Sequence, residues 1–408
     1  MEESEFDWKS FEKQAINQLM KGEPLEGKDG VLTPLIKRLL EAGINGEMDA
    51  HVGTNRPNRR NGYTEKSLKT SHGTVELNLP RDREGSFDSL LIPKRRSTLG
   101  ASLDNKILGL YGLGMSYADI RGHLHEMYGL ELSEATLCSV TDKVYEELSL
   151  WQTRQLDAVY PFVWLDALHY KVRHEGRVVT RAVYTILALS LEGKKELLGL
   201  YLGESEGARF WLAVLSDLKS RGVEDIFIAS IDGLKGFPDA IESMYPHTKV
   251  QLCLVHQMRN SLRYIVDKDS RQVARELKCI YNAPNLAGAQ QAFDQWSRQW
   301  GKKYPVVVKS WTNNWDRLMT MYEFPPDIRH IIYTTNMVEG VHRQLRKVTK
   351  TKGAFTNDMA LMKLLFMTQQ RISKKWNKCH KNWGLTIQQL HILYGDRLKL
   401  PGSSSDTG

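Results

Sequence analysis

Residues 162–173 read FVWLDALHYKVR, an apolar run that predicts a buried β-strand with one carboxylate, Asp166, in its middle. Taking an unpaired charge out of water costs several kcal/mol, so natural chains seldom bury one without a partner or a task. Either Asp166 lies in solvent at a strand end, or a cation balances it. The rest of the sequence bears on this choice.

The segments that follow Asp166 predict a mixed α/β fold. In chain order they are strands at 178–191 and 196–205, a helix at 205–222, a strand at 225–232, a short helix at 238–246 and a strand at 248–256. Three hairpin-linked strands followed by alternating helices and strands are typical of the ribonuclease-H-like arrangement, a mixed sheet with helices on its faces.

Helical patterns flank this sheet on both sides in the sequence. Helices are predicted at 31–50, in three short pieces within 103–150, throughout 257–330, and in a last block that begins near Thr335 and continues past Arg371. The three short helices suit a helix-turn-helix whose third helix reads DNA, although such units are also common structural cores. Residues 56–96 predict a basic module with a short strand at 74–80.

Five regions follow from these patterns. They are an N-terminal helix and basic, β-containing region for DNA binding or oligomerisation at 1–100, a helix-turn-helix-like DNA-binding region at 101–155, a catalytic core divided into 156–256 and 331–400, and an all-helical insertion at 257–330.

Composition indicates an ordinary globular protein inside the cell. Of the 408 residues, 41% are hydrophobic and 25% are charged. No apolar run approaches the ~20 residues of a membrane span, and the polar start MEESEFDWKS argues against a signal peptide. Four scattered cysteines suit a reducing compartment. We therefore expect a cytoplasmic protein without a membrane partner.

The net charge of +8 is concentrated in two basic blocks. Residues 339–381 carry eleven Lys and Arg against two acids, which gives +9, and residues 56–96 carry ten against five, which gives +5. A lysine-rich run is often only a solvated helix face. Two basic blocks flanking a carboxylate-bearing core nevertheless favour a nucleic-acid partner.

Asp232 is the second candidate acid. It ends the predicted strand 225–232, and the first and fourth strands of such a sheet are neighbours, so Asp166 and Asp232 are predicted to lie close together. Gly233 and Gly236 permit tight turns at this point. Taken alone, each aspartate has an equally good interpretation as a cap or turn residue.

Glu339 is the third candidate acid, and it also has two interpretations. Three residues after Asn336, it can complete a capping box at the start of a helix. Alternatively, it leads a basic stripe on one helix face, because Arg343, Arg346 and Lys350 follow at offsets of 4, 7 and 11.

Three carboxylates in one crevice repel each other unless divalent cations neutralise them. Mg²⁺ prefers oxygen ligands and keeps positions for water and phosphate, and two such ions roughly 3.5–4 Å apart suit in-line phosphoryl transfer. Asp166, Asp232 and Glu339 are therefore predicted as catalytic residues and as ligands of two Mg²⁺ ions, with Mn²⁺ as a substitute.

Two long segments closely resemble one family. Residues 232–260, DGLKGFPDAIESMYPHTKVQLCLVHQMRN, and 334–355, TTNMVEGVHRQLRKVTKTKGAF, are similar to the mutator-type transposases of bacterial insertion sequences, and the resemblance covers roughly 30–395. It implies a DDE active site on a ribonuclease-H-like domain, with the three acids in the matching places. It also implies terminal inverted repeats and target DNA as partners, a dimer or larger assembly, a nucleoid-associated bacterial protein and a circular excised intermediate.

Four residues near these motifs are less certain. Cys253 and His256 match a C-x-x-H element of the family; a second ligand pair is missing, so zinc is disfavoured, and a contact of His256 with DNA or a catalytic carboxylate competes with core packing. His342 stands where relatives are expected to have asparagine. Trp311 is a weak candidate for stacking on a flipped base, against the commoner core role.

The predicted DNA contacts are Arg59, Arg60 and Lys66 in the first block, and Arg343, Arg346, Lys347, Lys350 and Lys352 in the second. The predicted reaction is cleavage by water, followed by attack of the freed 3′-OH on a second phosphodiester. A repressor derived from a transposase is the main competitor, but it would have lost an acid. A junction-resolving nuclease on the same fold would lack the N-terminal region.

Overall fold

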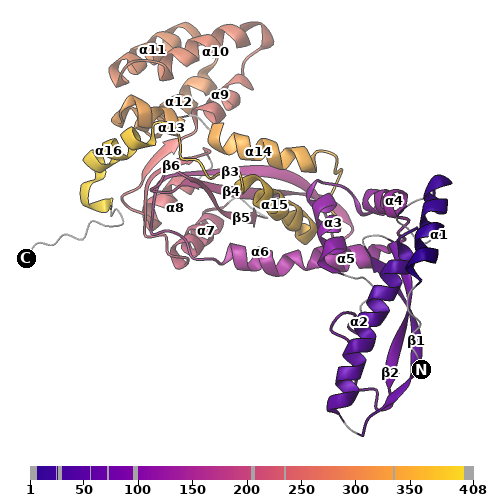
Figure 1. The fold of residues 1–408 in the computed structure, drawn as a ribbon. Helices are drawn as coiled ribbons and strands as arrows, with labels where there is room; N and C mark the ends of the chain where they lie inside the picture. The colour runs from indigo at the N-terminus through magenta and orange to yellow at the C-terminus, as the bar shows by residue number, and fades with distance from the viewer. Residues whose placement is uncertain are drawn as a thin grey trace, which may run out of the picture. The chain divides into compact units, whose positions relative to one another are not determined.

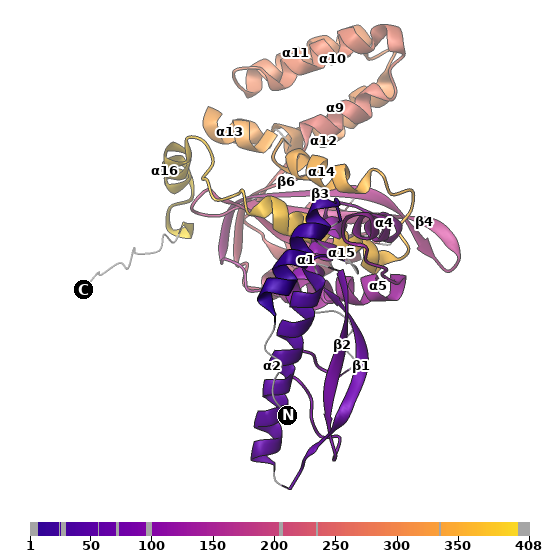
Figure 2. The same ribbon diagram turned by 45° about the vertical axis from the view of Figure 1, so that its right-hand side comes forward.

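The computed structural model describes residues 7–23, 25, 30–55, 57–70, 73–94, 100–203, 207–233, 236–333 and 336–398. The chain divides into two compact units, residues 1–145 and 146–408, whose elements are drawn in Figures 1 and 2. Within the described ranges, no helix combines the length and apolarity needed to cross a membrane.

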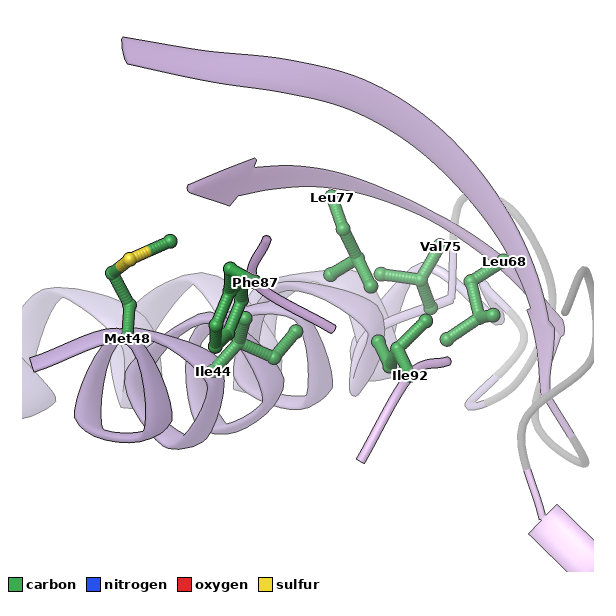
Figure 3. Close-up of a cluster of buried hydrophobic side chains, with 7 residues drawn as sticks. All are labelled: Ile44, Met48, Leu68, Val75, Leu77, Phe87 and Ile92. Atoms are coloured by element: carbon green, nitrogen blue, oxygen red, sulfur yellow. The ribbon is translucent and has the colours of Figure 1, made fainter. Parts of the chain in front are cut away.

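The first unit combines helices with one β-hairpin. Its elements are α1 (Trp8–Met20), α2 (Thr33–Thr54), β1 (Arg60–Thr70), β2 (Gly73–Asp82), α3 (Gly100–Gly112), α4 (Tyr117–Tyr128) and α5 (Glu134–Asp142). β1 and β2 pair in antiparallel fashion. Side chains from α2, the hairpin and the loop after β2 form one core, shown in Figure 3: Ile44, Met48, Leu68, Val75, Leu77, Phe87 and Ile92.

Two details of this unit differ from the sequence patterns. β1 was not predicted, because only Leu68 and Thr70 of its eleven residues are buried, and its polar sequence conceals the strand. The last of the three short helices predicted within 103–150 is divided at Lys143 into α5 and α6 (Val144–Gln152). The side chains of Ser116 and Ser133 cap α4 and α5.

A five-stranded mixed sheet forms the centre of the second unit. Its strands are β3 (Val159–His174), β4 (Arg177–Leu189), β5 (Lys195–Gly203), β6 (Asp225–Ile231) and β7 (Lys249–Leu252), in the spatial order β5-β4-β3-β6-β7. β3, β4 and β5 are antiparallel neighbours, whereas β6 runs parallel to β3 and β7 parallel to β6. The predicted mixed α/β class is confirmed.

Helices account for most of the rest of this unit. They are α7 (Ala208–Ser220), α8 (Phe237–Met244), α9 (Leu254–Leu262), α10 (Asp267–Tyr281), α11 (Leu286–Trp300), α12 (Pro305–Met319), α13 (Pro326–Tyr333), α14 (Asn336–Thr349), α15 (Asp358–Ser373) and α16 (Trp383–Tyr394), with short 3₁₀ turns η1 (Thr320–Glu323) and η2 (Gly395–Arg397). The strand predicted at 248–256 is wrong in its second half, because Cys253 caps α9 and ends the extended backbone at Leu252.

The two faces of the sheet are covered by different helices (Figure 1). Asp166 and Thr185 are paired across β3 and β4, so their side chains share one face, and α14 packs against both strands. Tyr184 points to the opposite face, where its ring lies 4.5 Å from that of Trp211 in α7. The ring of Trp211 in turn stacks on Phe237 of α8. The α14 side carries the candidate site.

Candidate active site

The register of two parallel strands brings the two predicted aspartates together. Leu165 of β3 is paired with Ile231 of β6, so Asp166 and Asp232, the residues that follow this pair, lie close together. Asp166 lies within β3 and is only 9% exposed, whereas Asp232 follows the end of β6 and is partly exposed. Strand pairing therefore positions Asp166 directly, and it positions Asp232 through the end of β6.

His256 lies between these aspartates. Its Nε2 is 3.9 Å from Asp166 Oδ1, and its Nδ1 is 3.7 Å from Asp232 Oδ1. The side chain comes from the first turn of α9, where Cys253 Sγ accepts a hydrogen bond from the His256 backbone N–H at 3.4 Å. Of the roles considered for the Cys253–His256 pair, the geometry favours contact with the carboxylates.

Glu339 lies on the first turn of α14 and faces a different partner. Its Oε1 is 3.4 Å from a guanidinium nitrogen of Arg259, which lies one turn after His256 on α9. α9 thus supplies a side chain to each of the three acids. The competing capping-box role for Glu339 depends on the Asn336 side chain, which lies outside the described part of the chain.

His342 connects α14 to the strand that carries Asp166. Its Nδ1 is 3.5 Å from Asp166 Oδ2, and its Nε2 is 2.6 Å from Thr185 Oγ1. Thr185 Oγ1 also donates to the backbone carbonyl of Asp166 at 3.1 Å. His342 is 2% exposed, and burial, with help from the nearby Arg346 charge, lowers its pKa to about 3. At neutral pH this imidazole is uncharged.

The electrostatics of Asp166 reflect its crowded position. Burial raises its pKa, and the negative charges of Asp232 and Glu339 raise it further. The charge of His256 and a hydrogen bond from the Ala167 N–H oppose this rise. The carboxylate is therefore held at a cost that a nearby cation would relieve.

The residues present suit a divalent cation. One oxygen of each aspartate and a ring nitrogen of His256 all lie within 4.8 Å of one another. His256 Nδ1 is buried and has no hydrogen-bond partner among the described residues, so a ligand-capable atom is left unsatisfied beside two carboxylates. Oxygen donors are the ligands that Mg²⁺ and Mn²⁺ prefer.

Comparison with known proteins identifies the family of this chain. The profile of the family described as "Transposase, Mutator family" matches residues 8–379. The chain is 40% identical over 397 residues to the transposase for insertion sequence element ISRM3 of Rhizobium meliloti, covering 95% of this chain and 99% of that one. It is 31% identical over 366 residues to the IS905 transposase of Lactococcus lactis, covering 89% and 92% of the two chains.

The chain belongs to the Mutator family of transposases. Family membership makes it a DNA-acting enzyme in general terms. The resemblance of the two quoted segments to mutator-type transposases is thereby confirmed.

The basic stripe of this transposase lies on the solvent side of α14. Arg343, Arg346, Lys347 and Lys350 are exposed, whereas Val341, Leu345 and Val348 on the other side of the helix are buried. Lys352, beyond the end of the helix, is partly buried. The helical spacing read from the sequence therefore separates the charged face from the packed one.

The predicted contacts of the first basic block are more heterogeneous. Arg60 donates to Asp49 Oδ1 from its Nε at 3.0 Å and to Asn45 Oδ1 at 3.1 Å. Lys66 donates to the Pro93 carbonyl at 3.2 Å, and burial lowers its pKa. Arg59 is exposed, and no side-chain partner is found for it among the described residues. Of these three, Arg59 is the one that the structure leaves open to a phosphate.

Trp311 is a core residue, and its candidacy for base stacking is corrected here. It is 0% exposed, its indole N–H donates to Ser261 Oγ at 2.9 Å, and its ring stacks near that of Phe293. No face of the ring is available to a base in this structure. The commoner interpretation of helical tryptophans was the right one.

Sequence reasoning missed two residues that contact the site, Arg259 and Thr185. The segment up to His256 was interpreted as strand, so the helical spacing that places Arg259 one turn after His256 was not available. Thr185 lies in a strand pattern that gives no chemical signal, and only the pairing with Asp166 reveals it.

Proposed function

We propose that this transposase is a DDE enzyme that cleaves and joins DNA strands with divalent metal ions, with Asp166, Asp232 and Glu339 as its catalytic acids. The observation that carries the proposal is the pairing of β3 with β6, which sets Asp166 and Asp232 side by side. Glu339, on the first turn of a helix that packs against β3, is the third proposed acid.

A ribonuclease-H-like fold for the sheet is part of this proposal. The strand order β5-β4-β3-β6-β7, with three antiparallel strands followed by two parallel ones, supports it. The acids then lie on the central strand, on its parallel neighbour and on a helix that follows a helical excursion of the chain from α9 to α12.

The metal ions would be held by the three carboxylates, Mg²⁺ by preference and Mn²⁺ as a substitute. Two bound ions would polarise the attacking and the leaving oxygen of an in-line phosphoryl transfer. The chain's own residues fix the reacting groups: strand pairing holds Asp166 and Asp232, and the bridge through His342 and Thr185 holds α14 against the sheet.

The chemistry consists of two exchanges of phosphodiester bonds. In the first, a water oxygen bonds to phosphorus as the bond between phosphorus and a 3′ oxygen breaks. The water loses a proton, and the departing 3′ oxygen takes up a proton to become a free 3′-OH. In the second, that 3′-OH bonds to another phosphorus and displaces a different 3′ oxygen. No covalent bond to the protein is needed, and a circular excised intermediate fits this sequence of steps.

DNA contacts are proposed at two places. The exposed stripe of α14 begins one turn after Glu339, so it is suited to hold backbone next to the reacting phosphate. Residues 1–150, with Arg59 and the helix-turn-helix-like α3 to α5, would recognise the terminal inverted repeats, and a dimer would bring two ends together beside the target DNA, at the nucleoid.

The test uses Asp166→Asn, Asp232→Asn and Glu339→Gln, assayed with Mg²⁺ on labelled terminal-repeat DNA. Each change is expected to lower strand cleavage by about 10³-fold or more, because metal-assisted phosphoryl transfer supplies several kcal/mol. DNA binding, measured separately, should remain. Asp294→Asn, an exposed acid on α11, is the matched control and should keep full activity.

Full cleavage by any of the three variants would refute the assignment of that residue. Loss of binding together with cleavage would recast the acids as structural. Joined DNA products from the unaltered protein support a transposase, whereas hydrolysis without joining supports a nuclease.

A further inference from the structure

The position of His256 goes beyond what three catalytic acids require. It is a nitrogen donor between two carboxylates, at 3.9 Å from Asp166 and 3.7 Å from Asp232. A core histidine normally satisfies both ring nitrogens with hydrogen bonds. Here Nδ1 is buried and has no such partner among the described residues. Leaving a buried polar atom without a hydrogen-bond partner is unfavourable, so this nitrogen calls for an explanation.

The backbone holds this imidazole firmly in place. The Cys253 N–H donates to the Ile231 carbonyl at 2.8 Å, which ties the start of α9 to the end of β6. Cys253 then caps α9 through its sulfur, which places His256 on the first turn. The neighbouring Gln257 donates to Ser310 of α12 at 3.0 Å. The ring is thus positioned by α9, whose start is tied to the end of β6, and not by a flexible loop.

The surroundings of the ring favour a cation rather than a third polar side chain. The groups that approach its nitrogens are carboxylate oxygens, and all three donor atoms lie within 4.8 Å of one another. Such spacing allows the donors to share a single ion. An imidazole nitrogen is a softer donor than a carboxylate oxygen, and it favours transition metals over Mg²⁺.

We propose that His256 is a nitrogen ligand of the divalent ion held by Asp166 and Asp232, and that it strengthens Mn²⁺ binding at this position more than Mg²⁺ binding. The inference rests on the proposed function, because it places the ion between the same two aspartates. It assigns a chemical role to the histidine and a metal preference to one of the two ion positions. The three acids alone account for neither of these.

The experiment is a Mn²⁺ titration of the full-length protein, followed by electron paramagnetic resonance, with pulsed measurements that detect nitrogen bonded directly to Mn²⁺. The unaltered protein should show one such nitrogen. His256→Asn should abolish that signal and weaken Mn²⁺ binding by about tenfold or more, with a smaller loss for Mg²⁺ in competition. His256→Gln provides a second variant if His256→Asn does not fold.

Two histidine controls make the assignment specific. His247→Asn, an exposed position on the loop between α8 and β7, should leave the nitrogen signal unchanged. His342→Asn tests the other imidazole near Asp166, and it should also leave the signal in place. If the signal disappears in His342→Asn and persists in His256→Asn, the inference is overturned.

The remaining outcomes separate this inference from the proposed function. One outcome is that Asp166→Asn and Asp232→Asn lose Mn²⁺ binding while the unaltered protein with bound Mn²⁺ gives no nitrogen signal. This outcome refutes the role of His256 and leaves the DDE site in place. If Mn²⁺ binds more tightly to His256→Asn, the imidazole competes with the ion, which also refutes the inference. If Mn²⁺ binding is insensitive to both aspartates, the proposed site itself fails.

Discussion

The two basic blocks of this transposase use their charge in opposite ways. In the first unit, Lys66, Lys69 and Lys94 all donate to backbone carbonyls, those of Pro93, Glu131 and Gly85, and Arg60 pairs with Asp49. On α14 the basic side chains are exposed to solvent, and the opposite side of the helix is buried. Similar runs of Lys and Arg thus make several hydrogen bonds within the protein in the first unit, whereas on α14 they stay exposed to solvent and a partner can reach them.

Secondary structure explains the difference. The carbonyls within a helix are already bonded along its own backbone, so basic side chains on its surface find few local acceptors. Loops leave carbonyls without partners, and the lysines around the β1–β2 hairpin supply the missing donors. A charge count therefore predicts a polyanion partner best where the charges lie on a regular helix.

The largest expected effect comes from removing the α14 stripe. Arg343→Gln, Arg346→Gln and Lys347→Gln together should reduce the magnitude of the negative slope of log affinity against log salt by roughly 2.7, because each phosphate contact contributes ~0.9. At 0.1 M salt this corresponds to about a 500-fold loss of DNA affinity. Binding to labelled DNA across a salt series measures both quantities.

A matched triple variant tests whether position matters or only charge. The helical insertion has three exposed basic residues, Arg298, Lys302 and Lys309. Their replacement by Gln removes three positive charges, as in the α14 triple variant. We expect a much smaller change in slope. Equal effects of the two triple variants would mean that the α14 stripe contacts DNA no more than other exposed basic residues do, which would contradict the contrast between the two blocks.

The next effect concerns the first unit, where the fold depends on a buried acid. Asp82 accepts hydrogen bonds from Asn58, from Ser86 and from the Phe87 N–H. Asp82→Ala leaves these donors unsatisfied and should destabilise the hairpin by about 3 kcal/mol. Hydrogen exchange at the amides of β1 and β2 measures the loss, and the exposed Glu84→Gln in the same turn is the control.

Acid should reproduce part of this effect in the unaltered protein. Burial alone would raise the pKa of Asp82, but its hydrogen bonds outweigh burial and hold the pKa well below the usual value. Because the unfolded chain then binds the proton more readily, the contribution of Asp82 is present at neutral pH and declines as the pH falls below about 4. Exchange protection in β1 and β2 that is independent of pH in this range would contradict it.

The smallest effect is expected from two adjacent arginines. Arg60→Gln removes an exposed ion pair and should cost less than about 1 kcal/mol of stability without changing the salt slope. Arg59→Gln should leave stability unchanged and reduce the magnitude of the salt slope by ~0.9, the contribution of one phosphate contact. The reverse pattern would show that position in the sequence, rather than the presence of local hydrogen-bond acceptors, decides which arginine contacts DNA.

Much of the second unit was predictable from the sequence because its signals are local. The apolar runs of β3, β4 and β6 and the turns between them predicted the strand positions, and Asp166 stood out as a charge within such a run. The proximity of Asp166 to Asp232 followed from strand order alone. These inferences needed no knowledge of side-chain packing.

The errors arose where a local pattern had two solutions or where contacts were distant. The run QLCLVH suits a strand or a helix, and the cap provided by Cys253 decides for the helix. β1 is too polar for its pattern to be seen. The internal partners of Arg60 and Lys66, and the bridge from His342 to Thr185, depend on tertiary proximity, for which a single sequence carries no signal.

The order of the acids along the chain has a consequence for synthesis. Asp166 and Asp232 are translated early, whereas the helix with Glu339 follows 107 residues after Asp232, beyond the excursion from α9 to α12. At ~5–20 residues per second, the ribosome needs roughly 5–20 s to add this segment. Under the proposed function, a nascent or prematurely terminated chain is expected to lack cleavage activity. In vitro translation of chains ending before α14 would test this.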